Sequence, residues 1–83
     1  MKDRVFQILS QIMGTPVEHI REDSSPDTIP EWDSLKHMRL VLALEEEFSV
    51  RFSDETIVGM LNVSEILKAL MDHQPRVKSF AQP

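Results

Sequence analysis

The 83-residue sequence contains no cysteine and no tyrosine, and only two of its residues are glycine. Without cysteine the chain forms no disulfide, and it offers no thiolate to a metal ion or to a substrate. The three histidines, His19, His37 and His73, are far apart and lack the spacing of metal ligands. We therefore expect no metal site, and we expect these histidines to lie on the solvated surface.

Positive charge is also scarce. Nine Lys and Arg residues stand against 14 Asp and Glu residues, which gives a net charge of −5. This balance disfavours binding to nucleic acid and favours basic partners. No apolar run is long enough to span a membrane, and no signal peptide is recognisable, so we expect a cytoplasmic protein. A chain of this length makes one small domain without room for a large catalytic cavity.

Apolar residues recur with the period of a helix, and no alternation typical of strands occurs. The pattern predicts three longer helices and one short one: residues 3–13, residues 34–48, a short helix after Ser53, and a last helix from Val63 to Pro75. Because most connections are short, we expect an all-α, antiparallel four-helix bundle.

We assign residues 1–75 to this bundle and expect residues 76–83 to be a flexible tail. A long loop over residues 21–31 is rich in turn residues. Ile29 and Trp32 are the apolar residues expected to anchor it to the bundle. A loop of this length in a small domain is often functional.

The start of the second helix is the most informative stretch. Asp33 is a good N-cap, which places Ser34 at the first helical position with its hydroxyl facing water. The run after Leu35 has no glycine or proline and is rich in strong helix formers. The positive end of such a helix favours a negative group, and a phosphate attached there would lie near unpaired N–H groups.

The apolar residues of this helix divide into two stripes. One stripe suits a core and consists of Leu40, Val41, Leu44 and Phe48. The other lies on the side of Ser34 and consists of Leu35, Met38 and Leu42. Since a surface helix needs an apolar face of only about 100°, the second stripe is partly surplus. We expect a mixture, in which another helix buries part of this stripe and the rest is a contact surface beside the serine, with Met38 and Leu42 the more exposed.

Asp33, Ser34 and His37 are residue types of a hydrolase triad. Ser34 and His37 are three positions apart, so they can approach each other on a helix. A triad also needs an oriented base and an oxyanion hole, and the glycines of a nucleophile elbow are missing. We therefore predict that the protein is not an enzyme and has no catalytic residue.

Beyond Asp33-Ser34-Leu35, the pattern continues through Leu-Val-Leu-Ala-Leu-Glu-Glu-Glu-Phe at 40–48, Phe-Ser-Asp-Glu at 52–55 and Asn62-Val63. Together these motifs resemble the acyl carrier protein family. The resemblance implies a four-helix bundle in which Ser34 carries 4′-phosphopantetheine, transferred from coenzyme A by a phosphopantetheinyl transferase. It implies that Asp33 and Leu35 belong to the cofactor-binding motif, and that the thiol of the arm presents acyl thioesters to acyl-loading and acyl-transfer enzymes.

The sequence departs from carriers of fatty acid synthesis at Lys36 and Arg39, where acidic residues are typical. We therefore expect a specialised, monomeric carrier for a lipid, fatty acid or polyketide pathway. The predicted partner-binding residues are Lys36, Met38, Arg39, Leu42, Glu45, Glu46 and Phe52. Two alternatives stay open: an aminoacyl or peptidyl carrier, and an unmodified helical protein-interaction module.

Overall fold

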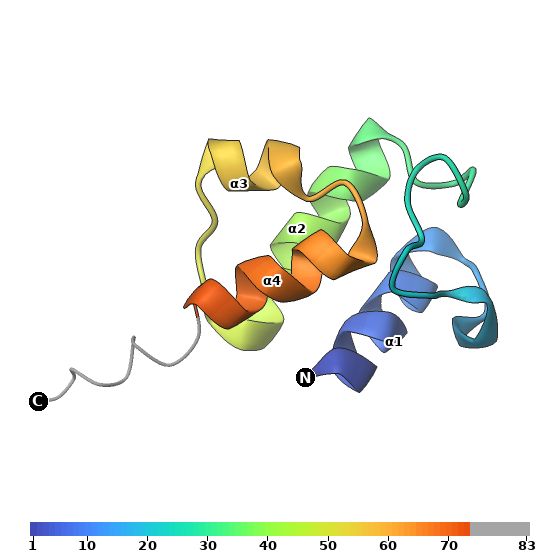
Figure 1. The fold of residues 1–83 in the computed structure, drawn as a ribbon, viewed down its shortest axis with the longest axis horizontal. Coiled ribbons are helices and arrows are strands. Elements are labelled where there is room, and N and C mark those ends of the chain that lie inside the picture. Colours follow the sequence, from blue (N-terminus) through green and yellow to red (C-terminus); the bar gives the residue numbers. More distant parts are fainter. Residues whose placement is uncertain (74–83) are drawn as a thin grey trace, which may run out of the picture.

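The computed structural model of the chain describes residues 1–73 (Figure 1). It contains four α-helices and one 3₁₀ turn: α1 (Lys2–Met13), η1 (Val17–His19), α2 (Ser34–Phe48), α3 (Asp54–Gly59) and α4 (Val63–His73). The described residues form no strand, which confirms the all-α prediction. Pro75 and the expected tail at 76–83 lie outside the described residues.

Helix α1 packs against α2, and its apolar stripe supplies one side of the core. The helix ends at Gly14, which has a left-handed φ of 72° and donates its N–H to the carbonyl of Ser10. Glycine adopts this conformation without steric cost. The end of the helix predicted at residue 13 is confirmed. The polypeptide then turns through η1 into the long loop.

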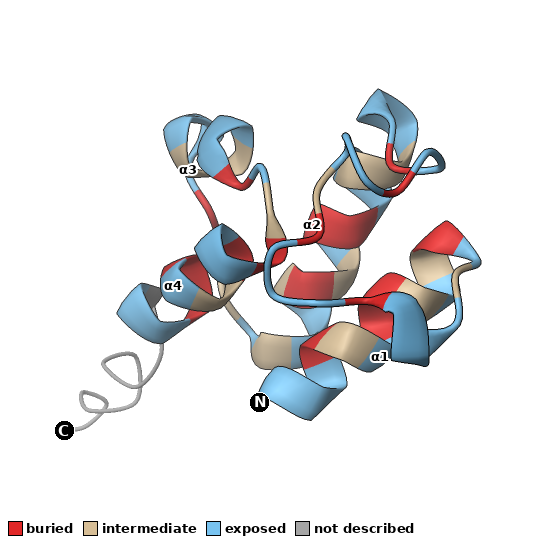
Figure 2. Cartoon of the chain, turned by 45° about the vertical axis from the view of Figure 1, so that its right-hand side comes forward, coloured by how far each residue is buried: buried red, intermediate tan, exposed pale blue. Residues whose placement is uncertain are grey.

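The core is one cluster to which every α-helix or its flanking segment contributes. Figure 2 shows the buried segments of α1, α2 and α4 facing the middle of the molecule. The centre of α2 supplies three buried residues, as its core stripe predicts: Leu40, Val41 and Leu44. Phe48, at the end of that stripe, is half-buried and packs against the same cluster.

The loop before α2 is held by more than its two apolar anchors. Ile29 and Trp32 are buried, as predicted. Within the loop, the Oγ of the buried Ser24 accepts a hydrogen bond from the backbone N–H of Arg21 at 2.8 Å. The carbonyl of Ser24 accepts the N–H of Val63 at 3.1 Å, at the start of α4. The loop therefore supplies acceptors to a helix start whose N–H groups lack partners within the helix.

Figure 1 places α3, the end of the long loop and the start of α2 at the same end of the molecule. Helix α3 has no fully buried residue of its own, and Met60 directly after it is buried. The short helix therefore forms part of the surface around the start of α2.

A matched pair of leucines on α2 tests this packing. Leu40 is completely buried, whereas Leu42 is 61% exposed. We expect Leu40→Ala to lower the free energy of unfolding by about 3 kcal/mol, because a cavity remains in the core. Leu42→Ala removes little burial and should cost about 0.5 kcal/mol or less. Urea denaturation followed by circular dichroism measures both, and equal losses would contradict the orientation of α2.

Candidate functional site

Asp33 fixes the start of α2. Its backbone is extended, and its Oδ1 accepts a hydrogen bond from the N–H of Lys36 at 2.9 Å. Its carbonyl accepts the N–H of His37 at 2.8 Å, the first bond of the helix. These bonds confirm the predicted N-cap. Ser34 is therefore the first residue of the helix, and its side chain is exposed.

The N–H groups of Ser34 and Leu35 have no hydrogen-bond partner among the described residues. They lie at the positive end of a 15-residue helix. An exposed hydroxyl beside two unpaired donors is a suitable attachment point for a phosphodiester, whose oxygens are acceptors only. The residues present therefore fit a phosphate-containing group on Ser34.

An open groove of about 450 Å³ begins beside Ser34. The long loop, α2 and α3 each provide part of its wall. Its apolar surface includes the exposed side chains of Met38, Val58 and Leu61. A flexible group attached to Ser34 has an apolar surface directly next to it.

His37 is not a solvated surface residue, which corrects the prediction. Its imidazole is half-buried, and Nδ1 accepts a hydrogen bond from the indole N–H of Trp32 at 3.0 Å. Because the indole nitrogen can only donate, Nε2 carries the ring proton and donates it to the carbonyl of Ile57 at 2.9 Å. Both ring nitrogens are engaged, and neither is directed as a base to Ser34.

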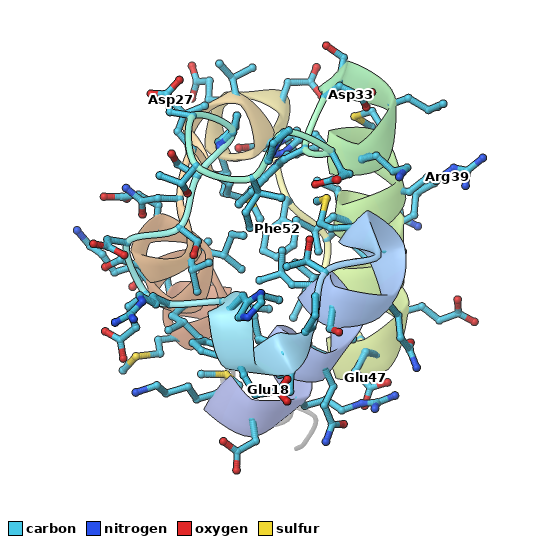
Figure 3. The ribbon with its side chains drawn as sticks, turned by 90° about the vertical axis from the view of Figure 1, so that its right-hand side faces the viewer. Glu18, Asp27, Asp33, Arg39, Glu47 and Phe52 are labelled. Carbon is cyan, nitrogen blue, oxygen red and sulfur yellow. The ribbon has the colours of Figure 1, made fainter. Side chains whose placement is uncertain are left out.

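The exposed face of α2 after Ser34 consists of apolar side chains with two cationic side chains beside them. Leu35, Met38 and Leu42 are all exposed, so none of the second stripe is covered by a described element. The expectation that Met38 and Leu42 are the more exposed is wrong, since Leu35 is as exposed as Leu42. Lys36 and Arg39 form no ion pair within residues 1–73, and Figure 3 shows Arg39 pointing outward from α2.

The three glutamates at the other end of α2, residues 45–47, make different contacts. Oε2 of Glu45 accepts the backbone N–H of Phe52 at 2.9 Å. Glu47 pairs with Arg4 at 3.0 Å, and this hydrogen bond, together with the carboxylate charge, raises the pKa of Arg4. Glu46 is exposed and makes no ion pair with another described residue.

Phe52 is only 7% exposed, and Figure 3 shows it in the middle of the molecule. Its burial is a correction to its place among the predicted partner-binding residues, because a side chain in the core is not available to another protein. Glu45 is half-buried, and its carboxylate binds the backbone of the link between α2 and α3. Neither the burial of Phe52 nor the hydrogen bond of Glu45 follows from the helical repeat, so the periodicity of the sequence did not predict these two features.

Comparison with known proteins shows which family the chain belongs to. A family model described as a phosphopantetheine attachment site matches residues 3–70. An acyl carrier protein of Saccharopolyspora erythraea is 30% identical over 70 residues, which is 84% of this chain and 74% of that protein. The chain belongs to the acyl carrier protein family. A holo acyl carrier protein from Geobacter metallireducens has the same fold, with a TM-score of 0.80, 21% identity, and coverage of 99% of this chain and 92% of that chain.

The covalent cofactor of this acyl carrier protein is 4′-phosphopantetheine, as the match to the attachment-site family indicates. The unpaired N–H groups, the exposed serine and the apolar groove suit such an arm. Members of the family are carriers rather than enzymes. Among the helices of residues 1–73, none is long and apolar enough to cross a membrane. That part of the chain also has no cluster of His, Asp and Glu side chains suited to a metal ion.

The two neighbouring glutamates of α2 provide a test of the internal contact. Glu45→Ala leaves the Phe52 N–H without its carboxylate acceptor, and we expect a loss of about 1–2 kcal/mol in the free energy of unfolding. Glu46→Ala, the matched control, should change stability by about 0.5 kcal/mol or less. Thermal and urea denaturation measure the difference. A Glu45→Ala protein as stable as the control would show that the bond contributes nothing.

Proposed function

We propose that Ser34 is the residue that carries the phosphopantetheine arm. The observation that supports this most strongly is the exposed Ser34 hydroxyl at the N-terminus of α2, next to two unpaired N–H groups and the groove. When bound, the arm supplies a thiol that holds an acyl group as a thioester. Asp33 holds the start of the helix in place, and Leu35 contributes one of the unpaired donors.

The partner-binding face in this proposal surrounds Ser34 on α2. It consists of Leu35, Lys36, Met38, Arg39 and Leu42, with Glu46 farther along the helix. A phosphopantetheinyl transferase must reach the Ser34 hydroxyl, and acyl-loading and acyl-transfer enzymes must reach the end of the arm. Exposed apolar residues ringed by charges are typical of surfaces that bind protein partners.

The charge order along α2 supports a specialised carrier in a lipid, fatty acid or polyketide pathway. Two cations lie within the first two turns after Ser34, and the acids follow from Glu45 onward. Like charges at a contact disfavour binding. Enzymes that place cations against an acidic first turn therefore suit this protein poorly. We propose cognate partners with an acidic or neutral patch near the arm entrance and a basic patch farther away.

Mass spectrometry tests the attachment site. Incubation of the protein with coenzyme A, Mg²⁺ and a broad-specificity transferase should add the mass of one phosphopantetheine group. Ser34→Ala should remain unmodified, because the acceptor hydroxyl is gone. Ser64→Ala is the matched control, since Ser64 is also exposed and lies in the first turn of α4. Modification of Ser34→Ala, or no modification of the parent protein, would refute the proposal.

Charge reversal tests the choice of partner. The double variant Lys36→Asp with Arg39→Glu should be acyl-loaded by a general fatty acid synthesis enzyme about tenfold faster than the parent, because steering depends on complementary charge. The measurement is the initial loading rate at low salt, where screening is weakest. As control, Arg51→Glu with Lys68→Asp makes the same change in net charge outside the proposed face. Equal acceleration by both double variants would mean that the two cations near Ser34 have no special part in recognition.

A further inference from the structure

The groove beside Ser34 is bounded on its inner side by a chain of hydrogen bonds. Trp32 donates from its indole N–H to His37, and His37 donates to the carbonyl of Ile57, over distances of 3.0 and 2.9 Å. The two rings lie nearly parallel, with an interplanar angle of 21°. All three residues line the groove. The chain therefore joins the end of the long loop, α2 and α3 along one wall of the groove.

The residues behind this wall are buried. Trp32 is only 3% exposed, and it belongs to the same core cluster as Leu40, Met60 and Ile66, which are buried almost completely. The groove is open to solvent and about 450 Å³ in volume, and its lining includes Trp32 but none of those three residues. A long alkyl group that leaves the groove for the core must first separate the Trp32, His37 and Ile57 groups.

Separation of these groups is unfavourable for a definite reason. An alkyl chain offers neither an acceptor to the indole N–H nor a donor to the Ile57 carbonyl. Trp32 is buried, and a buried polar group that loses its partner without gaining another is disfavoured. Helix α3 has no fully buried residue, and the bond from His37 to the Ile57 carbonyl joins it to α2 in addition to the packing of Ile57 against the core. The bond that closes the wall thus also joins α3 to α2.

We propose that the Trp32–His37–Ile57 chain determines which cargo this carrier shelters. It closes the core of the bundle, so a short or polar acyl group lies in the surface groove and a long saturated chain is kept out of the interior. Trp32 and His37 are therefore specificity-determining residues. The proposal rests on the attachment of cargo at Ser34, and it deepens that function by naming the class of cargo.

A cysteine variant tests the closure without the cofactor. Because the chain contains no cysteine, Ser34→Cys introduces a single thiol. Its thiolate attacks an alkyl methanethiosulfonate, forms a disulfide to the alkylthio group and releases methanesulfinate. Propyl and dodecyl reagents then place a short and a long chain at the start of the groove. Since no transferase takes part, failure of the arm to attach to Ser34 and failure of the closure are separate results.

Methyl NMR and melting temperature report where each chain lies. In the Ser34→Cys protein, both adducts should shift the methyl signals of Met38, Val58 and Leu61 and leave those of Leu40 and Ile66 unchanged. The two adducts should melt within about 2 °C of each other, because methylene groups outside the core add little stability. Large shifts of the Leu40 and Ile66 methyls in the dodecyl adduct would overturn the proposal.

Variants of His37 test whether the hydrogen bonds are what keeps the dodecyl chain out of the core. His37→Leu removes both the acceptor and the donor, and its dodecyl adduct should melt well above its propyl adduct and shift the Leu40 and Ile66 methyls. His37→Gln retains an acceptor oxygen and a donor nitrogen, so it should behave like the parent. Trp32→Phe removes the indole donor together with part of the buried ring, and it replaces His37→Leu in the test if that variant does not fold. A variant that only destabilises the bundle lowers the melting temperatures of its propyl and dodecyl adducts by the same amount. If the two adducts changed equally in every variant, including His37→Leu, the proposal would be contradicted.

Discussion

The capping bond from the Asp33 carboxylate to the N–H of Lys36 is the constraint on which the site depends. It ends the loop and begins α2 at one definite residue. Consequently Ser34 is exposed at the first helical position, and the N–H groups of Ser34 and Leu35 have no protein acceptor within residues 1–73. A start one residue earlier or later would rotate every following side chain by about 100°. The core stripe, the exposed stripe and the two cations would then all face in other directions.

Tertiary contacts keep this helix start in place relative to its surroundings. The loop is anchored by Trp32 beside the cap, and by Ser24 at the start of α4. From α2, His37 reaches both the indole of Trp32 and the carbonyl of Ile57. A small domain has little apolar area to bury. Directed polar contacts therefore contribute more to the position of the α2 start than they would in a larger domain. The surroundings of Ser34 are therefore set by bonds among three segments that are separate in sequence.

The features predictable from the sequence are those that local rules govern. The helical period predicted α2 and its core residues Leu40 and Leu44, and capping preferences predicted Asp33 as the N-cap. The roles of His37 and Phe52 were missed, because their partners lie 20 and seven positions away and no periodic pattern relates them. One signal was available for the first of these. A tryptophan expected to be buried needs an acceptor for its indole N–H, and His37 is the nearest imidazole along the chain.

In the function that we propose, recognition is divided between two surfaces that meet at Ser34. The exposed face of α2 would present charged and apolar side chains to partner proteins, and the groove would present an apolar wall to the group that Ser34 carries. Met38 belongs to both, because it is exposed on α2 and lines the groove. A group that fills the groove therefore contacts a residue of the partner-binding face. Since methionine adapts its shape readily, the proposed function places at Met38 the contact through which a docked enzyme would detect a change in cargo.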